Sequence, residues 1–583
     1  MLINIHNKKK RVKSEGTGTA LKILVDHVIM SGYEKMLACA SKIAGVDSQA
    51  TSSTDGTMIV LTASDIEMSD FKLNPFLAFA GGFPEILVQK KLYPSLPSNH
   101  DGSARYAPYG LRKVESLLID EFGEENVVVA HPDNLHQFIG PKTKIIGITT
   151  MDPLGTGFVS RTYTSVLGLD GKPATMAEFE KLMNNQAIKG TNAKIIVGGS
   201  GAWQISDSGM QGAFGIDAVL IGQAERSLPS IIRKMINGEA VSNSISMDMP
   251  SPEEVPLIKK PAIYGTVEIM RGCGRGCSFC SPTLRHCHSF PLERIVKEAE
   301  LNAQGGARMI ILQTDDIFLY QGREHFLPNK GAIVDLIKAM DRIQGIEYLQ
   351  PAHASLAPVV YDPSIVEDIA PTLVEKSTWT CRGDRCASVE VGIESGSPRL
   401  MKQYMRGKML PYRPEQWQDV VVKAVETMND NKVYPLATLI LGLPGEQKED
   451  VRATVELLER LEGSKIFYVP LLFTSEEESR LRNQHHGSLK DLDDEQWGIL
   501  SSCWKHNIDV WSPEKSMAIM FASTLSLPYF WMKHGNRILS PVLRISGLED
   551  RLIGRKAGIN CQPNYCSLDP PLIEEVVCEH GGK

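Results

Sequence analysis

Three cysteines in one short segment carry the most definite chemistry in this sequence. The segment RGCGRGCSFC holds Cys273, Cys277 and Cys280, with three and then two residues between them. Thiolates are the usual ligands of iron–sulfur clusters, and a full set for a [4Fe–4S] cluster is four. Three thiols leave one iron open to another ligand, as catalytic metal sites require. The spacing therefore predicts a reactive [4Fe–4S] cluster at these residues.

The residues around the three cysteines leave one alternative open. Gly272, Gly274 and Gly276 would let the backbone wrap closely around a cluster, where side chains would collide. The alternative is a structural zinc knuckle, which needs a fourth ligand at matching spacing. The residues that could supply it are Cys287 and its neighbours His286 and His288.

Length and composition exclude several classes of protein. The 583 residues are too many for one hydrophobic core, and 42% hydrophobic with 22% charged residues is typical of soluble globular proteins. A net charge of −7 gives no sign of a nucleic-acid-binding surface, and no apolar run approaches the roughly 18 residues of a membrane helix. Eleven cysteines without a secretory signal favour a reducing compartment. We therefore expect a cytoplasmic protein whose partners include neither nucleic acid nor membrane.

The first of two series of apolar runs predicts a doubly wound, Rossmann-like domain. Its β-branched runs alternate with helical segments, a pattern typical of a parallel sheet covered on both faces. Such sheets bind ligands beyond the carboxyl ends of their strands. The expected strands are Met58–Ser64, Asn126–Ala130, Lys144–Thr150, Lys194–Gly201 and Ala218–Glu225, with helices at Tyr109–Gly123 and Arg226–Asn237.

The second series begins with the strand that precedes the cysteines. Six strand–helix units suit a partial (β/α)6 barrel, with its chemistry at the C-terminal ends of the strands. The expected strands are Gly265–Gly272, Met309–Asp316, Ile346–His353, Ser388–Ser395, Tyr434–Glu446 and Lys465–Leu472. The expected helices between them include Leu292–Ala303, Lys330–Ile343 and Glu415–Met428.

Shifts in pattern divide this α/β chain into five parts. A proline-rich stretch without periodicity separates the two series, and the region after the second series is mainly helical. The parts are an N-terminal extension at 1–57, the Rossmann-like domain at 58–245, a linker at 246–262, the partial barrel at 263–474 and a helical C-terminal domain at 475–583.

The cysteine motif resembles the signature of the radical S-adenosylmethionine (SAM) superfamily, including Phe279 just before the third thiol. The resemblance implies that the amino and carboxylate groups of SAM chelate the open iron. TDD after the second strand, GIESGSPRL at the fourth and LGLPGE after the fifth match the segments that hold the rest of SAM. Each is weak alone, because an acid at a strand end is often only a helix cap. The implied SAM-binding residues are Phe279, Thr314, Asp315, Glu394, Ser395 and Pro444.

The superfamily resemblance also implies a radical mechanism. One electron from the reduced cluster, supplied by a partner such as ferredoxin or flavodoxin, cleaves SAM into methionine and a 5′-deoxyadenosyl radical. That radical takes a hydrogen atom from an unactivated carbon. The protein positions the reactants and excludes water and oxygen.

A doubly wound domain ahead of such a barrel resembles the cobalamin-binding module of the largest radical SAM subfamily. ITTMDPLGTG after the third strand, VGGSG after the fourth and GQAE after the fifth carry the likeness. Glycines there would let a large ring and its nucleotide tail approach the backbone. The implied cobalamin-binding residues are Met151, Pro153, Gly155, Thr156, Gly198, Gly199, Gly222, Gln223 and Glu225.

One departure from related cobalamin proteins concerns the cobalt ligand. The Asp-x-His-x-x-Gly signature of the mutases is absent, and no histidine lies between Gly140 and Gly201. Asp133 and His136 are close together, but their spacing is wrong and they precede a strand. We therefore expect a lower cobalt face without histidine, which is empty, water-bound or near a residue such as Met151 or Leu154. The alternative is a domain that has lost cobalamin or binds something else.

The domain order implies a methyltransferase. Members with this order are commonly C- or P-methyltransferases, so the resemblance implies methylation of an unactivated sp3 carbon through a 5′-deoxyadenosyl radical and methylcobalamin. The chain is similar, among these, to enzymes that C-methylate a glutamine of methyl-coenzyme M reductase, and its substrate is expected to be a protein or a small molecule. Two alternatives stay open: a cobalamin-containing radical enzyme that forms a ring or carbon–carbon bond in a lipid or small molecule, and a non-catalytic iron–sulfur and corrinoid sensor.

The remaining cysteines include two pairs with equal spacing. The pairs Cys381/Cys386 and Cys561/Cys566 could together hold zinc or a second cluster, since four thiols suit either. The alternative is that all four are ordinary thiols, as we expect for Cys39, Cys503 and Cys578.

Overall fold

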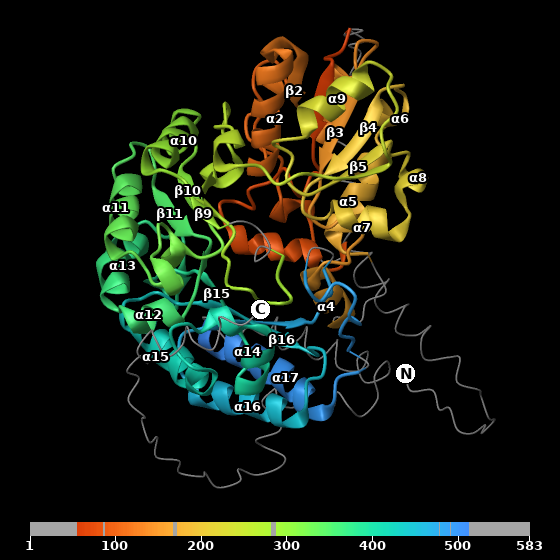
Figure 1. Cartoon of the computed structure of the whole chain (residues 1–583). Coiled ribbons are helices and arrows are strands. Elements are labelled where there is room, and N and C mark those ends of the chain that lie inside the picture. Colours follow the sequence, from red (N-terminus) through yellow and green to blue (C-terminus); the bar gives the residue numbers. More distant parts are fainter. Residues whose placement is uncertain are drawn as a thin grey trace, which may run out of the picture. The chain divides into compact units, whose positions relative to one another are not determined.

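The computed structural model describes residues 55–85, 88–166, 172–281, 287–476, 479–489 and 491–511. Its fold is mixed α/β, and a doubly wound parallel sheet precedes a partial barrel of parallel strands (Figure 1). Expectations for the chain before residue 55 and after residue 511 lie outside the described residues. They include those for Cys39, Cys561, Cys566 and Cys578.

The first sheet has six parallel strands in the order β2-β1-β3-β4-β5-β6. Five of them match the strands expected from the sequence. The sixth, β6, pairs with β5 and was not expected, because its residues Ser-Ile-Ser are short, polar and mostly exposed. The bounds are β1 Ile59–Thr62, β2 Val127–Val129, β3 Ile145–Thr149, β4 Lys194–Gly198, β5 Ala218–Ile221 and β6 Ser244–Ser246.

Alternate residues of these strands supply two separate cores, because successive side chains of a strand point to opposite faces. On one face, Ile59 of β1 and Ile145 of β3 pack with helices α2 and α9. On the other, Val60 of β1 and Ile146 of β3 pack with α5, α6 and α7. The apolar strands are therefore covered on both faces, as their sequence predicts. The helices are α2 Tyr109–Phe122, α3 Leu135–Phe138, α4 Phe158–Val166, α5 Ala174–Met183, α6 Gln186–Lys189, α7 Ala202–Ser208, α8 Gln211–Phe214 and α9 Leu228–Ile236.

The second series of strands forms the partial barrel as two hydrogen-bonded runs, β7-β10-β11 and β12-β15-β16-β17, in which every pair is parallel. Only Ala352 separates β11 from β12, so the chain passes directly from one run to the next. The bounds are β7 Val267–Glu268, β10 Met309–Gln313, β11 Tyr348–Pro351, β12 His353–Ala354, β15 Glu390–Glu394, β16 Leu436–Leu441 and β17 Phe467–Leu472. Two short antiparallel pairs are β8 Met270–Arg271 with β9 His288–Ser289, and β13 Thr380–Cys381 with β14 Asp384–Arg385.

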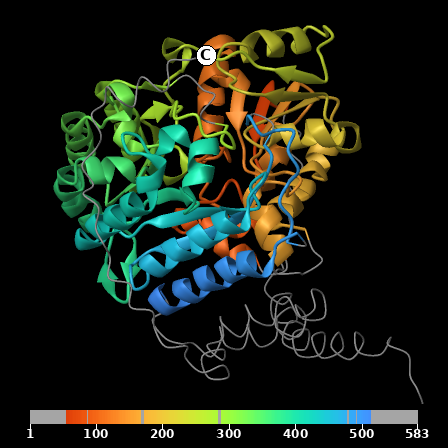
Figure 2. The ribbon, with the colours of Figure 1, turned by 60° about the horizontal axis from the view of Figure 1, so that its bottom comes forward.

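The helices of the second series lie outside the barrel strands (Figure 1). They are α10 Leu292–Gln304, α11 Lys330–Asp341, α12 Ala357–Tyr361, α13 Ser364–Glu375, α14 Pro398–Tyr404, α15 Trp417–Asp430 and α16 Lys448–Arg460. The next helix, α17 Asp494–Trp511, packs beside α16 and β17 (Figure 2). None of the helices in the described ranges is long and apolar enough to cross a membrane.

Buried polar contacts join the helices of the sheet to the barrel. The hydroxyl of Tyr109 on α2 donates to Glu298 Oε2 on α10 at 2.7 Å, and Lys113 forms an ion pair with the same carboxylate. Glu298 is only 2% exposed, so this pairing compensates a charge that would be costly to bury alone. The amide of Leu472, at the end of β17, donates to Thr162 Oγ1 on α4 at 2.9 Å. These contacts tie α2 and α4 directly to the barrel.

Candidate functional site

The cysteine loop follows β8 and buries its thiols. Cys273 and Cys277 are 9% and 7% exposed, and Cys280 is partly buried. The glycines that separate and precede them, Gly272, Gly274 and Gly276, have φ values of +72°, +66° and +80°. Side chains rarely adopt this left-handed conformation, so the loop requires glycine at these positions.

The three thiols form one electrostatic group that suits a cluster. Burial raises the pKa of Cys273 to about 11, and burial together with the other two thiols raises that of Cys280 well above its usual value. Such thiols stay protonated until a positively charged centre stabilises the thiolate form, which metal binding does by displacing the proton. The donor set of three neighbouring cysteines in a glycine loop therefore fits a [4Fe–4S] cluster with one open iron.

Arg275, inside this loop, is fixed by buried partners. Its Nη1 donates to the carbonyl oxygen of Gly407 at 2.9 Å, and its Nη2 donates to Asp316 Oδ2 at 2.8 Å. Asp316, which follows β10, also accepts from the amide of Ser355 at 3.1 Å and is 2% exposed. The third residue of the TDD segment is therefore a support for the cluster loop, a role that the strand-end pattern did not indicate.

The first two residues of that segment have different environments. Thr314 is 1% exposed, and its Oγ1 accepts from the amide of Asp316 at 3.0 Å, so its hydroxyl shapes the turn after β10. Asp315 is partly buried and lies close enough to Cys273 and Cys280 to raise their pKa values. Of the two, Asp315 faces the cluster site.

Glu394, at the end of β15, is held by two side chains. Lys408 Nζ donates to its Oε1 at 2.6 Å, and Thr438 Oγ1 of β16 donates to its Oε2 at 3.0 Å. The residue is 6% exposed and has a φ of +64°, where the pairing of β15 with β16 is irregular. A Cβ on Gly392 would lie 2.0 Å from Oε1 and 2.1 Å from Lys408 Nζ, so a side chain at that position would displace this ion pair.

Lys408 is a candidate site residue that sequence reasoning missed. Burial by itself lowers its pKa, but Glu394 and then Cys277 raise it above its usual value. The ammonium therefore stays charged between the carboxylate and the thiols. Lys408 lies fourteen residues after Glu394 in a short turn without periodicity, so no sequence pattern indicated that the two side chains would meet.

Three other expected SAM-binding residues lie around this site. The hydroxyl of Ser395 is used within the protein, because it lies 3.2 Å from Thr454 Oγ1 and accepts from the amide of Ser397. The carbonyl oxygen of Pro444 accepts from the hydroxyl of Tyr404 at 2.7 Å. Phe279 is partly buried against the barrel core. Ser395 and Pro444 thus shape the strand-end turns through internal hydrogen bonds.

The loop after β3 in the first sheet presents Met151 to solvent. Its side chain is 67% exposed, and its amide donates to Glu67 Oε1 at 2.6 Å. Burial raises the pKa of Glu67 to about 7, although hydrogen bonds from Met151 and Ser64 oppose the shift. Sequence reasoning also missed Glu67, which holds the loop after β1 to the loop after β3.

The rest of the loop after β3 is closely packed. Pro153 is buried and Thr156 is partly buried. Gly155 has a φ of +66°, and a Cβ there would lie 2.2 Å from the ring of Pro173. Glycine at position 155 is therefore required by the protein's own packing.

The turn after β4 brings together two glycines with different surroundings. A Cβ on Gly199, where φ is +98°, would lie 2.5 Å from the carbonyl oxygen of Thr150. A Cβ on Gly198 would meet no atom closer than 3.9 Å. Gly199 is required by close packing against β3, whereas a side chain at position 198 would make only ordinary van der Waals contact with Leu220.

The turn after β5 contacts the strand that leads into the cysteine loop. Arg271 Nη1 donates to Gln223 Oε1 at 2.6 Å and lies 2.9 Å from Glu225 Oε1, while Glu268 binds the other side of the guanidinium at 2.8 Å. Gly222, at the start of the turn, has a φ of +108°. The side chains of Gln223 and Glu225, which follow it, both contact Arg271. We call these four residues, Gln223, Glu225, Glu268 and Arg271, the arginine clasp.

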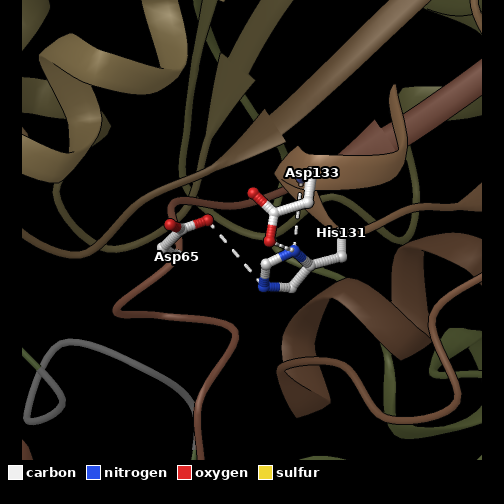
Figure 3. Close-up of side chains that lie close together, drawn as sticks. All are labelled: Asp65, His131 and Asp133. Carbon is white, nitrogen blue, oxygen red and sulfur yellow. Dashed lines mark hydrogen bonds and ion pairs between the residues drawn. The ribbon is translucent and has the colours of Figure 1, made fainter. Parts of the chain in front are cut away.

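A second polar cluster lies at the ends of β1 and β2. Figure 3 shows His131 with Nε2 directed toward Asp65 and Nδ1 toward Asp133, at 3.8 and 3.3 Å. Among the described residues these three meet the spacing of a metal site. Asp65 already accepts from Lys90 and Lys181 at 2.9 and 2.7 Å, which compensate its charge. The buried Asp65 is therefore paired with two lysines at the surface, while Asp133 is exposed and burial lowers the pKa of His131.

The other cysteines within the described ranges lie in three places, one of which is α17, where Cys503 is buried. Cys381 and Cys386 are both buried beside the β13–β14 pair, near Tyr434. Cys287 is exposed, and its Cβ lies 3.6 Å from the position a Cβ would take on Gly274. Cys561 and Cys566, the proposed metal partners of Cys381 and Cys386, lie outside the described residues. The same holds for His286, which was considered with Cys287 as a fourth zinc ligand.

Comparison with known proteins identifies the barrel. Residues 267–458 match the radical SAM superfamily. A tRNA-2-methylthio-N(6)-dimethylallyladenosine synthase of Mycobacteroides abscessus is 26% identical over 282 residues, which are 47% of this chain and 52% of that protein. The ribosomal protein uS12 methylthiotransferase RimO of Cytophaga hutchinsonii is 30% identical over 199 residues, 33% of this chain and 40% of that protein. The chain thus spans about half the length, or less, of these two curated relatives.

Among solved structures, the radical SAM methyltransferase TsrM from Kitasatospora setae, with tryptophan substrate and a SAM analogue bound, has a similar fold. The TM-score is 0.50 at 15% identity, over 73% of this chain and 75% of TsrM. Another TsrM structure, with cobalamin and a [4Fe–4S] cluster bound, gives 0.47 at 14% identity. The cysteine loop, the barrel and the superfamily match agree: the chain contains a radical SAM domain, whose cofactors are a [4Fe–4S] cluster and SAM.

Proposed function

We propose that this chain is a cobalamin-dependent radical SAM methyltransferase acting on an unactivated sp3 carbon. The observation that carries the proposal is the arginine clasp, because it joins a strand-end turn of the first sheet to the strand that enters the cysteine loop. Parallel sheets bind ligands at this edge. A corrinoid held there would lie beside the radical SAM site.

The proposed division assigns cobalamin to residues 58–245 and radical chemistry to residues 263–474. In the barrel, Cys273, Cys277 and Cys280 would hold the cluster, and Glu394 with Lys408 would orient the amino or ribose groups of SAM. When bound, the cluster and SAM would supply a 5′-deoxyadenosyl radical, and cobalamin would supply the methyl group. The protein's own task is to position the substrate between the two edges and to exclude water.

The surroundings of the first sheet's edge support a flat, apolar ligand. Met151 is the most exposed of the large hydrophobic side chains in the described ranges, at the edge where a ligand would cover it. Gly198 has no side chain, and a Cβ there would meet Leu220 only at an ordinary contact distance of 3.9 Å, so a ring could approach the backbone there. The loops after β3, β4 and β5 contain no histidine, which supports a cobalt without a histidine ligand.

Anaerobic purification followed by iron, sulfide and corrinoid analysis tests the proposal. We expect four irons and one corrinoid for each chain. A methyltransferase should consume two SAM molecules for each product, one yielding S-adenosylhomocysteine and the other 5′-deoxyadenosine. Protein without corrinoid affinity would contradict the proposal.

A methylthiotransferase is the second candidate, favoured by the curated relatives, which are 26% and 30% identical over about a third to a half of this chain. Mass spectrometry of the product separates the two, because methylthiolation adds sulfur and C-methylation does not. Ring or carbon–carbon bond formation without methyl transfer, the remaining alternative, would leave S-adenosylhomocysteine undetected.

The narrower proposal is a protein substrate, namely a glutamine of methyl-coenzyme M reductase. A reducing partner such as ferredoxin or flavodoxin would complete the reaction. Incubation of the reduced enzyme with that protein should add 14 Da, about one methyl group, to a single glutamine-containing peptide. A peptide map without this shift would leave the methyltransferase proposal standing and remove the substrate.

A further inference from the structure

A hollow of about 440 Å³ lies beside the cysteine loop. Gly274, Arg275 and Gly276, which connect two of the cluster cysteines, form one wall. Arg406 and Arg480 also line it, contributed by the segment after α14 and by the segment after β17. Segments far apart in the sequence therefore converge on the residues that separate Cys273 from Cys277.

The hollow is positively charged. Three arginines line it, and its described lining residues include no aspartate or glutamate. Arg275 is buried and paired with Asp316, whereas Arg406 and Arg480 are exposed. The whole chain has a net charge of −7, so this surface is basic against an acidic background.

The positive charge of Arg480 lies close to the cysteines proposed to bind the cluster. Arg480 Nη1 is 4.0 Å from the position that a Cβ would take on Gly276, the residue before Cys277. Gly274 is exposed at the wall of the hollow. A protein seated there would be separated from the cluster by little more than a glycine backbone.

Hydrogen bonds hold the walls to the cysteine loop. The amide of Ser278 donates to the carbonyl oxygen of Tyr404 at 2.8 Å, and the carbonyl oxygen of Ser278 accepts from the amide of Leu481 at 3.2 Å. A Cβ on Gly407 would lie 1.9 Å from the Arg275 carbonyl oxygen, so the chain packs directly on the loop there. The hollow is thus a fixed surface, because backbone contacts set its walls.

We infer that this hollow docks the acidic one-electron donor protein that reduces the cluster. The donor loses one electron and the cluster gains one, with no bond formed or broken. Opposite charges would steer the acidic donor to this face. Phe326 and Tyr404 line it beside the arginines, and aromatic residues with arginine are typical of protein interfaces. The inference depends on the cluster and is independent of methyl transfer.

Charge reversal of the two exposed arginines tests the inference in the anaerobic holoenzyme. For the double variant Arg406→Glu, Arg480→Glu we expect the affinity for an acidic flavodoxin, measured by calorimetry at low salt, to fall at least tenfold. Cluster reduction by reduced flavodoxin, followed by absorbance, should slow by a similar factor. Reduction by titanium(III) citrate should keep its rate, because a small reductant needs no docking surface.

A matched control carries the same change in charge elsewhere. Lys338→Glu with Lys423→Glu places it on the exposed sides of α11 and α15, and should leave flavodoxin affinity unchanged. Equal flavodoxin affinity in wild type and the arginine variant would overturn the assignment. So would equal slowing with both reductants, or an equal loss in the lysine control. The methyl-transfer proposal would survive any of these outcomes, since corrinoid binding is measured separately.

Discussion

The cysteine loop of the barrel and the turn after β4 of the first sheet are both rich in glycine, for different reasons. In the loop, Gly274 and Gly276 need a positive φ, yet a Cβ there would meet its nearest neighbour at 3.6 and 4.0 Å. In the turn, a Cβ on Gly199 would lie 2.5 Å from the backbone of Thr150. Glycine in the loop is therefore required by the backbone conformation alone, whereas in the turn it also lets the chain pack on itself. Glycine content alone does not indicate a ligand.

Removing the thiols should have the largest effect. The triple variant Cys273→Ala, Cys277→Ala, Cys280→Ala should lose all cluster iron and all formation of 5′-deoxyadenosine, because no other protein ligand replaces them. Iron analysis and chromatography of the products measure both. Cys287→Ala is the control and should keep the cluster. Loss of metal in that variant would instead favour the zinc knuckle.

The turn after β4 offers a sharper test of the first sheet. Gly198→Phe should lower corrinoid affinity by about a hundredfold or more, because the added ring would occupy the place proposed for the corrinoid at the sheet edge, while its Cβ would only contact Leu220. Absorbance titration with cobalamin measures it. Gly212→Phe on α8, where a Cβ meets nothing within 4 Å, is the control. Substitution of Gly199 does not serve this purpose, because it would disturb the fold itself. Unchanged affinity in Gly198→Phe would place the corrinoid elsewhere.

Glu394→Gln should weaken SAM binding by roughly tenfold to a hundredfold, or about 1.5–3 kcal/mol, since a charge-assisted hydrogen bond is lost. The cluster should remain, because Glu394 binds Lys408 and Thr438 and no cysteine. Equilibrium dialysis with SAM gives the affinity. Glu347→Gln, in an exposed ion pair with Arg308, is the control. Equal affinities would assign Glu394 to the support of β15 alone.

The arginine clasp predicts a smaller, selective effect. Arg271→Gln should keep the cluster and SAM cleavage, but raise the ratio of 5′-deoxyadenosine to methylated product severalfold. The reason is that Gln223 and Glu225 would no longer hold the two edges together. Arg271→Lys should restore part of the coupling. An unchanged ratio in Arg271→Gln would mean that the clasp is not needed for positioning.

The smallest effect concerns stability and pH. Glu67 binds a proton more tightly in the folded state, since burial raises its pKa from 4.5 to about 7. Its contribution to stability is therefore complete below about pH 4.5 and is lost as the pH rises through 7. Relative to Glu67→Gln, the wild-type free energy of unfolding should fall by about 1–3 kcal/mol between pH 5 and pH 8. Urea denaturation at both values measures the difference, and parallel pH profiles would contradict it.

Local patterns in the sequence determined the strands of both series and the cysteine loop. Five strands of the first sheet and the barrel strands were predicted because buried parallel strands are short apolar runs, although the structure divides the predicted strand Ile346–His353 into β11 and β12. β6 was missed because its exposed, polar residues lack that pattern. The cysteine spacing predicted the cluster ligands without knowledge of the fold, because all three thiols lie within one loop of eight residues.

Only the tertiary structure decided which charged residues support the site. Lys408, Asp316 and Glu67 reach their partners from segments whose sequences show no shared motif. Gln223 and Glu225 were expected to bind cobalamin, a role that remains a proposal, but in the structure both contact Arg271, 48 and 46 residues further along the chain. A local sequence pattern can specify a strand, a turn or a metal-binding loop. It cannot specify which distant side chain will lie within 3 Å, because that depends on how the strands are ordered and packed.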